Sequence, residues 1–144
     1  VFIGPVSTDV SQIENLPNVH LLGPRPYADL PSYLKGFDVA TVPFVIHDVT
    51  LRASPVKFYE YLASGIPIVA AMLPDLERFQ GLAELYNSHE DFIAALDRSV
   101  RDKSPKTREA RLREATKNSW QTRFSEVDRL IAEALQRKLE ESPV

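Results

Sequence analysis

The chain has 144 residues, of which 44% are apolar and 26% charged, and its formal net charge is -3. These values are typical of one globular domain, and without clustered Lys and Arg they exclude nucleic acid as the expected partner. The chain has no cysteine, which excludes disulfides and cysteine-held metals and fits a reducing cytoplasm. No apolar run approaches the roughly 18–20 residues that cross a bilayer.

The first third of the chain predicts three short strands and one helix. Apolar strands are expected at Val1–Gly4 and Val19–Leu22, each followed by a Gly-Pro turn, and a third at Val39–Phe44. Apolar residues at helical spacing predict a helix over Ala28–Gly36, with its last glycine as the stop. Because a native chain rarely begins inside a strand, we interpret the sequence as a fragment with residues missing upstream.

The middle of the chain predicts a helix over Pro55–Ser64, followed by two more strands. Ser54 is expected to cap the first amides of this helix, Pro55 suits its first turn, and Gly65 ends it. The strands are expected at Pro67–Ala71 and Leu82–Tyr86.

The last third is expected to be helical. Ser88 is the predicted cap of a helix whose core face is Phe92, Ile93, Leu96 and Val100. From Ser104 onward the chain is charged and helical, with a break expected near Trp120. The later part has an apolar stripe of Phe124, Val127, Ile131, Leu135 and Leu139. We expect core packing for Trp120, Phe124, Val127 and Ile131; the alternative is partial exposure in this fragment, toward a missing N-terminal domain.

Short apolar strands that alternate with helices predict a doubly wound α/β fold: a parallel sheet of about five strands, covered on both faces, with C-terminal helices. Ligands of such folds bind outside the carboxyl ends of the strands. The segments that follow the strands are therefore the candidate binding loops, namely Gly4–Ser7, Gly23–Tyr27, Phe44–Ser54 and Ala71–Asp75.

The helix at Pro55–Ser64 carries the most informative chemistry. It is apolar nearly all round, which predicts burial, yet it contains Lys57 and Glu60. A helix N-terminus with Ser54 and Lys57 nearby suits a diphosphate, and a carboxylate one turn further in suits a ribose diol. The alternative is that Lys57 and Glu60 form only an ordinary salt bridge at helical spacing.

Three pieces of sequence, in this order and spacing, resemble a known family. They are PNVHLLG, PYADLPSYLKGFDVATVPF and SPVKFYEYLASGIPIVA. Together they resemble the C-terminal domain of bacterial GT-B glycosyltransferases of the retaining group 1 (family 4) type. The pattern is closest to the subgroup with teichuronic-acid-type and other cell-surface polysaccharide transferases. The resemblance covers roughly Val1–Trp120 and implies one Rossmann-like half of a GT-B fold.

The resemblance assigns Glu60 to the ribose of the nucleotide. Family members usually carry an earlier glutamate near the transferred sugar, and that position is Arg52 here. We expect Thr50, Ser54 and Lys57 to line the diphosphate and sugar region instead. Catalytic residues stay unknown, with Lys57 and Arg52 as candidates.

The loop Gly23–Tyr27 is implied to lie near the base of the nucleotide. Arg25 could stack on the base or point to water. Tyr27 could contact the base or could instead be a hydrophobic staple for the helix that follows it.

The expected function is the donor-binding half of a glycosyltransferase that moves a sugar from a nucleoside diphosphate sugar to a glycan or lipid-linked acceptor. Residues 1–120 would form the nucleotide-sugar-binding domain, without its first strand and helix. Residues 121–144 would form a helix that packs on it or toward a missing N-terminal acceptor domain. The fragment alone is expected to be inactive, and the missing domain could bring peripheral membrane association.

The expected donor is a UDP-sugar, with GDP- or ADP-sugars as alternatives, and neither a further cofactor nor a protein-held metal is expected. The expected location is the cytoplasm. Two other functions stay open: a non-catalytic sugar-nucleotide-binding module, and a sugar-nucleotide epimerase of the same GT-B fold. The epimerase would need additional His and acidic residues around the sugar, which the sequence does not reveal.

Overall fold

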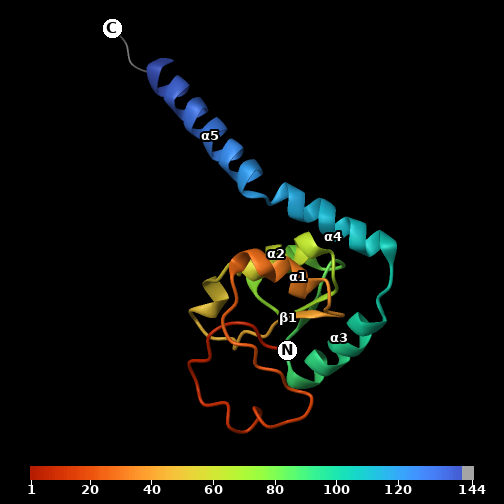
Figure 1. Cartoon of the computed structure of the whole chain (residues 1–144). Coiled ribbons are helices and arrows are strands. Elements are labelled where there is room, and N and C mark those ends of the chain that lie inside the picture. Colours follow the sequence, from red (N-terminus) through yellow and green to blue (C-terminus); the bar gives the residue numbers. More distant parts are fainter. Residues whose placement is uncertain (141–144) are drawn as a thin grey trace. The chain divides into compact units, whose positions relative to one another are not determined.

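The computed structural model describes residues 1–140 of the chain (Figure 1). Its described part divides into two compact units, residues 1–37 and the residues from Asp38 onward.

In the first unit, the two predicted strands form only one bridge, in which Phe2 pairs with Leu21 in parallel. The Phe2 amide donates to the His20 carbonyl at 2.8 Å, and the Leu22 amide donates to the Phe2 carbonyl at 2.9 Å. The prediction of two full strands is therefore wrong in extent. Each segment runs at once into Gly-Pro, and proline has no amide hydrogen with which to continue a ladder.

The helix predicted over residues 28–36 is shorter and in two parts. A 3-10 turn, η1 (Tyr27–Asp29), leads into α1 (Leu30–Leu34). Pro31 lies in the first turn of α1, where a missing amide hydrogen costs little. The chain then turns at Gly36, whose amide donates to the Tyr33 carbonyl at 2.9 Å.

The second unit contains a parallel sheet of three strands, β1 (Ala40–Val42), β2 (Ile68–Ala71) and β3 (Glu84–Tyr86). The strand order is β1-β2-β3, with Ala40 paired to Ile68 and Val69 paired to Glu84. The parallel α/β class is thus confirmed, whereas the described sheet has three strands rather than about five.

The central strand β2 is completely buried on both of its faces. Ile68 and Ala70 belong to a hydrophobic cluster that includes Phe58 and Leu62 of α2 (Val56–Ser64). Side chains alternate along a strand, so Val69 and Ala71 point to the other face, and both are fully buried there. On that side α3 (His89–Arg101) contacts β2 and β3.

Helix α2 buries one face rather than its whole circumference. Phe58 and Leu62, four residues apart, are fully buried, while Val56 and Ala63 are exposed. The prediction of burial all round is therefore wrong, because only the face toward the sheet and toward α4 (Pro105–Lys117) is covered. The predicted stop is confirmed: Gly65 adopts a left-handed φ of 75°, with the Arg108 side chain 3.0 Å from where a Cβ would lie.

The predicted cap of α3 is confirmed, but its predicted core face is partly wrong. The Asp91 amide donates to Ser88 Oγ at 3.1 Å. The fully buried positions are Ala95 and Ser99, and Ile93 and Val100 are exposed. The small side chains of Ala95 and Ser99 let α3 lie close against the sheet. With these two residues facing the sheet, Ile93 and Val100 lie on the outer side of the helix.

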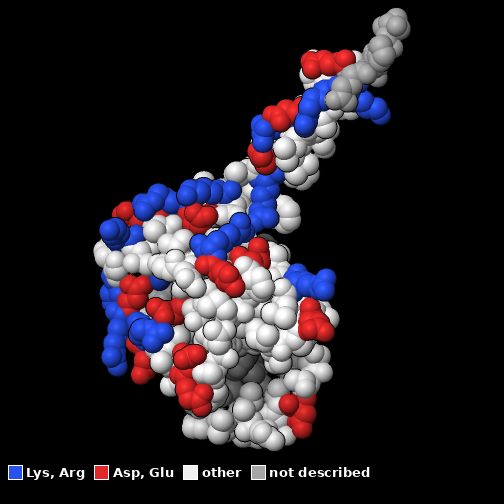
Figure 2. Space-filling view, turned by 180° about the vertical axis from the view of Figure 1, so that it is seen from behind, with Lys and Arg blue, Asp and Glu red and all other residues white. Residues whose placement is uncertain are grey.

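The last two helices are α4 and α5 (Trp120–Glu140), so the predicted break near Trp120 is confirmed. Ser104 Oγ caps α4 by accepting from the Thr107 amide at 3.3 Å. Contrary to the expected core packing, the apolar stripe of α5 is exposed over the described residues. Figure 2 shows acidic and basic side chains mixed along α5 beside uncharged ones.

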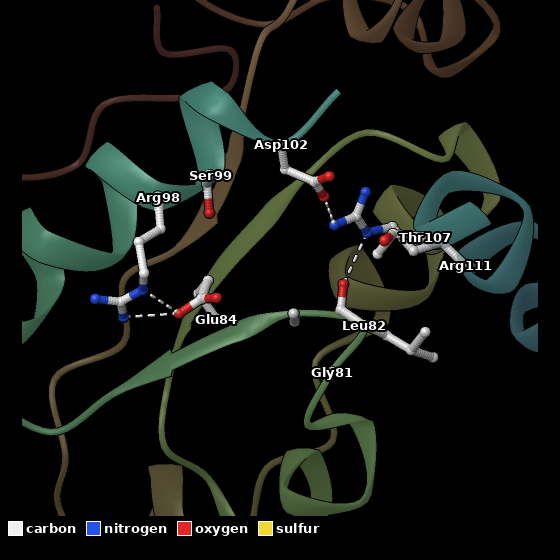
Figure 3. A pocket seen from close by; sticks show the side chains of 9 residues that line it. Gly81, Leu82, Glu84, Arg98, Ser99, Asp102, Thr107 and Arg111 are labelled. Atoms are coloured by element: carbon white, nitrogen blue, oxygen red, sulfur yellow. Dashed lines mark hydrogen bonds and ion pairs between the residues drawn. The ribbon is translucent and has the colours of Figure 1, made fainter. Parts of the chain in front are cut away.

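Arg111 of α4 ties three segments together (Figure 3). Its Nε donates to the Leu82 carbonyl at 2.7 Å and its Nη2 to Asp102 Oδ2 at 2.7 Å, and its Nη1 lies 3.4 Å from the Gly65 carbonyl. The side chain is only 6% exposed. A buried guanidinium with all these partners fixes α4 against the ends of α2 and α3 and the start of β3.

Replacing Arg111 should destabilise the chain strongly. Arg111→Met removes the donor to the Leu82 carbonyl and leaves the Asp102 carboxylate with the Ser104 amide, and hydrogen bonds to charged groups are worth about 1.5–3 kcal/mol each. Urea unfolding followed by circular dichroism measures the effect. The matched control is Arg113→Met on the same helix, whose exposed pair with Glu109 is worth about 0–0.5 kcal/mol. Similar losses in the two variants would contradict this role of Arg111.

The same pair predicts a pH dependence of stability. Burial raises the pKa of Asp102, but hydrogen bonds from Arg111 and the Ser104 amide, with the charges of Arg111 and Lys103, lower it below its ordinary value of 3.8. A carboxyl with a depressed folded-state pKa stabilises the fold above its unfolded-state pKa. That contribution is lost as the pH falls through the folded-state pKa.

Asp102→Asn should therefore be less stable than the wild type at pH 7, and the difference should shrink below about pH 4. Urea unfolding at several pH values from 7 to 2.5 measures it. The exposed Asp97→Asn on α3 is the control for removing one negative charge. A difference that stays constant over the whole range would contradict the assignment.

Candidate functional site

The carboxyl ends of β1 and β2 lead into two segments that meet. After β1 the chain runs through residues 43–55, including the 3-10 turn η2 (Thr50–Arg52), to the start of α2. After β2 it runs into a second 3-10 turn, η3 (Pro74–Phe79). Ser54 Oγ donates to Asp75 Oδ2 at 2.8 Å and so joins the two segments. Two of the four predicted binding loops therefore lie side by side.

Four polar side chains form a connected group here, which we call the Asp75 cluster: Ser54, Tyr59, Asp75 and Arg78. The Tyr59 hydroxyl donates to Asp75 Oδ2 at 3.2 Å and accepts from Arg78 Nη2 at 2.8 Å. Arg78 Nη2 also lies 3.6 Å from Asp75 Oδ1. The cluster thus holds one carboxylate between two hydroxyl groups and one guanidinium.

Aromatic rings hold the Asp75 cluster in place. Tyr59 packs edge to face against Phe79, with ring centroids 5.8 Å apart, and Phe79 is buried. The Arg78 guanidinium lies 4.7 Å from the centre of the Phe79 ring. Arg123, near the start of α5, lies 5.0 Å from the centre of the Tyr59 ring. Cations over aromatic faces are attracted by the ring electrons, so two arginines concentrate positive charge at this edge of the sheet.

The first turn of α2 differs from its prediction. Its N-cap residue is Pro55, and no side chain caps it. The prediction that Ser54 caps this helix is wrong, because the Ser54 hydroxyl donates to Asp75 instead. Pro55, which stands at the N-cap position, has no side-chain oxygen that could accept from the first amides. The first amides of α2 are therefore left without a side-chain acceptor, which is the arrangement that binds anions at helix starts. Lys57 lies exposed in this turn, and Glu60 lies half-buried one turn further along.

The predicted residues Thr50 and Arg52 lie in η2. The Thr50 hydroxyl accepts from the His47 amide at 2.9 Å and donates within its own loop, to the Val45 carbonyl at 2.6 Å. It therefore orders the loop, whatever else it contacts. Arg52 is exposed at the last position of η2.

The predicted base-binding residues Arg25 and Tyr27 belong to the first unit. Arg25 Nε donates to the Tyr33 hydroxyl at 3.0 Å, and its Nη1 lies 3.4 Å from the Pro24 carbonyl. These bonds fix the guanidinium over α1. Tyr27 is 73% exposed, so packing as a hydrophobic staple contributes little there. Their roles toward a base stay predictions.

A pocket of about 230 Å³ lies elsewhere, at the segment that enters β3 (Figure 3). Its polar walls include Glu84, which accepts two hydrogen bonds from Arg98 at 2.7 and 2.9 Å, and the Arg111–Asp102 pair. It lies at the amino ends of the strands, opposite the edge where ligands of parallel sheets bind. None of the predicted donor-binding residues lines it.

Residues 1–140 contain no group of three or more His, Cys, Asp or Glu side chains placed to hold a metal ion. No helix in this described part has the length and apolar character needed to cross a bilayer.

Residues 1–102 match the family model described as glycosyl transferases group 1. The chain belongs to this family. It is also 29% identical over 137 residues to a Bacillus subtilis (strain 168) protein named "Putative teichuronic acid biosynthesis glycosyltransferase TuaH". That alignment covers 88% of this chain and 34% of the relative, so the chain spans about a third of the relative's length. No solved structure matches the chain.

The resemblance seen in the sequence is thus confirmed at the level of the family: this is a group 1 glycosyltransferase domain. Such a domain implies binding of a nucleotide-sugar donor. The segment with Ser54, Lys57 and Glu60 lies inside the matched range, as does the Asp75 cluster.

Sequence reasoning missed three members of the Asp75 cluster. The sequence pattern marks the helix at Pro55–Ser64 as apolar nearly all round and does not single out Tyr59, whose hydroxyl bridges Asp75 and Arg78. Asp75 and Arg78 had no motif to mark them. One signal was present, because Asp75 ends a segment that the strand-end rule had already selected.

Removing the Tyr59 hydroxyl should loosen the cluster without unfolding the chain. Tyr59→Phe loses a donor to Asp75 and an acceptor for Arg78, and each net hydrogen bond is worth about 1 kcal/mol. Urea unfolding should show a loss of about 1–2 kcal/mol. Tyr61→Phe on the same helix is the control, since its hydroxyl makes no hydrogen bond within residues 1–140. Equal effects of the two changes would contradict the bridging role.

Proposed function

We propose that this chain is the donor-binding half of a glycosyltransferase that transfers a sugar from a nucleoside diphosphate sugar to a glycan or lipid-linked acceptor. The observation that carries the proposal is the family match over residues 1–102, which includes the uncapped start of α2 and Glu60 one turn behind it. The name of the relative supports a role in cell-surface polysaccharide synthesis.

The diphosphate of the donor would bind at the first turn of α2. Three features support this assignment: no side chain caps the helix, Lys57 is exposed in the same turn, and the Ser54 hydroxyl lies just before it. A helix start provides amide donors and a positive partial charge for an anion. Lys57 and Arg52 would stabilise the charge that develops on the departing diphosphate, together with the loop that Thr50 orders.

Glu60 would bind the ribose. Its carboxylate lies half-buried on α2, and its negative charge contributes, after burial, to raising the pKa of the neighbouring Tyr61. An ionised carboxylate has two oxygens and can accept from both hydroxyls of a ribose diol. With the phosphate at the start of the helix, this position one turn further along the helix suits the sugar next to it.

The proposed architecture is one Rossmann-like, doubly wound half of a GT-B fold. Residues 1–120 would form the nucleotide-sugar-binding domain, and residues 121–144 would form a helix that packs on it or toward an acceptor domain. The acceptor site, any membrane association and turnover would need the part of the protein outside this chain. Retention of the anomeric configuration and a cytoplasmic location belong to the same proposal.

A second candidate, a non-catalytic sugar-nucleotide-binding module, is favoured by one observation. Arg52 replaces the sugar-facing glutamate that the family usually carries, and it lies exposed in η2. Such a module would bind the nucleotide equally well, so only an assay of sugar transfer by the full-length protein distinguishes the two functions.

Titration with UDP, GDP and ADP by calorimetry tests the binding site. We expect saturable binding of one nucleotide, with UDP favoured. Glu60→Ala should weaken it about tenfold or more, the expected loss for hydrogen bonds to a charged group. The matched control is Glu109→Gln, an exposed carboxylate on α4, which should leave the affinity unchanged. Absence of binding at millimolar concentration, repeated with the full-length protein, would refute the proposal.

A further inference from the structure

We propose that Asp75 accepts a hydrogen bond from a hydroxyl group of the donor's hexosyl sugar, and thereby serves as the sugar-facing carboxylate of this domain. The inference rests on the proposed donor site at the start of α2. Asp75 would contact the transferred sugar, whereas Glu60 would contact the ribose and Lys57 the diphosphate.

The position of Asp75 follows from the sheet. Strand β2 ends at Ala71, and Asp75 lies shortly after it in the first turn of η3. Ser54 Oγ reaches Asp75 at 2.8 Å from the segment that enters α2. A diphosphate at the first turn of α2 would therefore lie next to the residue that holds Asp75. The sugar is bonded directly to that diphosphate, so it must occupy the adjoining space.

The two oxygens of the Asp75 carboxylate are used differently. Oδ2 accepts from both Ser54 and Tyr59, at 2.8 and 3.2 Å. Oδ1 accepts no hydrogen bond within residues 1–140, and its nearest cation is Arg78 at 3.6 Å. The Asp75 side chain is 34% exposed. One oxygen is thus anchored, while the other can still accept from a ligand.

The surroundings keep this carboxylate in a fixed place. Tyr59 is held by the Phe79 ring and by its bond to Arg78, so the anchoring hydroxyl cannot easily swing away. Arg78 also offsets the negative charge, which reduces its repulsion of a nearby diphosphate. A pre-positioned acceptor favours a ligand that brings a donor, and a sugar hydroxyl is such a donor.

The sequence supplies the reason why such a residue is needed. The usual sugar-facing glutamate is replaced by Arg52, which carries donors only and cannot accept from a hydroxyl. Asp75 provides an acceptor at the same edge of the sheet from a different loop. The substitution at Arg52 therefore does not leave the site without a carboxylate.

The test compares two ligands in each variant. Calorimetry gives the dissociation constants of the nucleoside diphosphate that binds best and of its hexose conjugates. For UDP these are UDP-glucose, UDP-galactose and UDP-N-acetylglucosamine. Asp75→Asn keeps the shape of the side chain but removes its charge. We expect affinity for the plain diphosphate to stay within about twofold. The affinity for the best hexose conjugate, divided by the affinity for the plain diphosphate, should fall about tenfold. This is the loss expected when one hydrogen bond to a charged group is weakened.

The matched control is Glu77→Gln, which removes an exposed carboxylate from the same turn and should change neither affinity. Urea unfolding of Asp75→Asn checks that this variant still folds.

Ser54→Ala is a second variant. It keeps the Asp75 carboxylate but removes one of the two hydroxyl groups that anchor it. Because Ser54 also lies at the proposed diphosphate site, the measure for Ser54→Ala is the ratio of the two dissociation constants. That ratio should shift in the same direction as in Asp75→Asn but by a smaller factor, and an unchanged ratio would contradict the anchoring role of Ser54.

The outcomes separate this inference from the proposed function. If Asp75→Asn binds both ligands with an unchanged ratio, or weakens both equally, the inference is wrong and the donor site still stands. If the wild type binds no nucleotide at all, the donor site fails, and the inference fails with it.

Discussion

The parallel pairing of β1 with β2 is the constraint on which the candidate site depends. Because Ala40 pairs with Ile68 and Val42 with Ala70, both strands leave the sheet at the same edge. The chain after β1 must return through α2, whose Phe58 and Leu62 cover one face of the sheet. The segments before α2 and after β2 are thereby brought within hydrogen-bonding distance, and the Ser54–Asp75 bond closes the contact. Every polar group proposed to hold the diphosphate, the ribose or the transferred sugar lies on one of these two segments or on the first two turns of α2.

Much of this second unit could be predicted from the sequence, because the deciding signals are local. Apolar runs placed the three strands, and Gly65 marked the end of α2 because the left-handed turn there excludes a Cβ. The Ser88 cap follows from chemistry within a single turn. The break before Trp120 was likewise visible in the pattern of apolar residues. The family assignment rested on three such local segments in the right order, and the match over residues 1–102 confirmed it.

The features that were missed depend on segments far apart in the chain. Ser54 has a suitable side chain for a cap, but Asp75, which the sheet brings beside it, takes its hydroxyl instead. Tyr59 was indistinguishable from its apolar neighbours until Arg78 was placed against it. The core face of α3 was misplaced because Ala95 and Ser99 are buried for their small size, which periodicity of large apolar residues does not detect. In the first unit, the backbone pairing of Phe2 and Leu21 was expected to extend further than its flanking prolines allow.

Arg111 has a consequence for where this domain ends. The family model matches residues 1–102, yet the guanidinium that satisfies the Leu82 carbonyl and the Asp102 carboxylate lies beyond that range, on α4. A boundary drawn at the end of the family model would cut the chain between Asp102 and its partner. During synthesis, likewise, the end of α3 and the entry to β3 would wait for α4 to emerge before their buried polar groups were satisfied. The folding unit is therefore longer than the recognisable family segment, and α4 belongs to it as much as the sheet does.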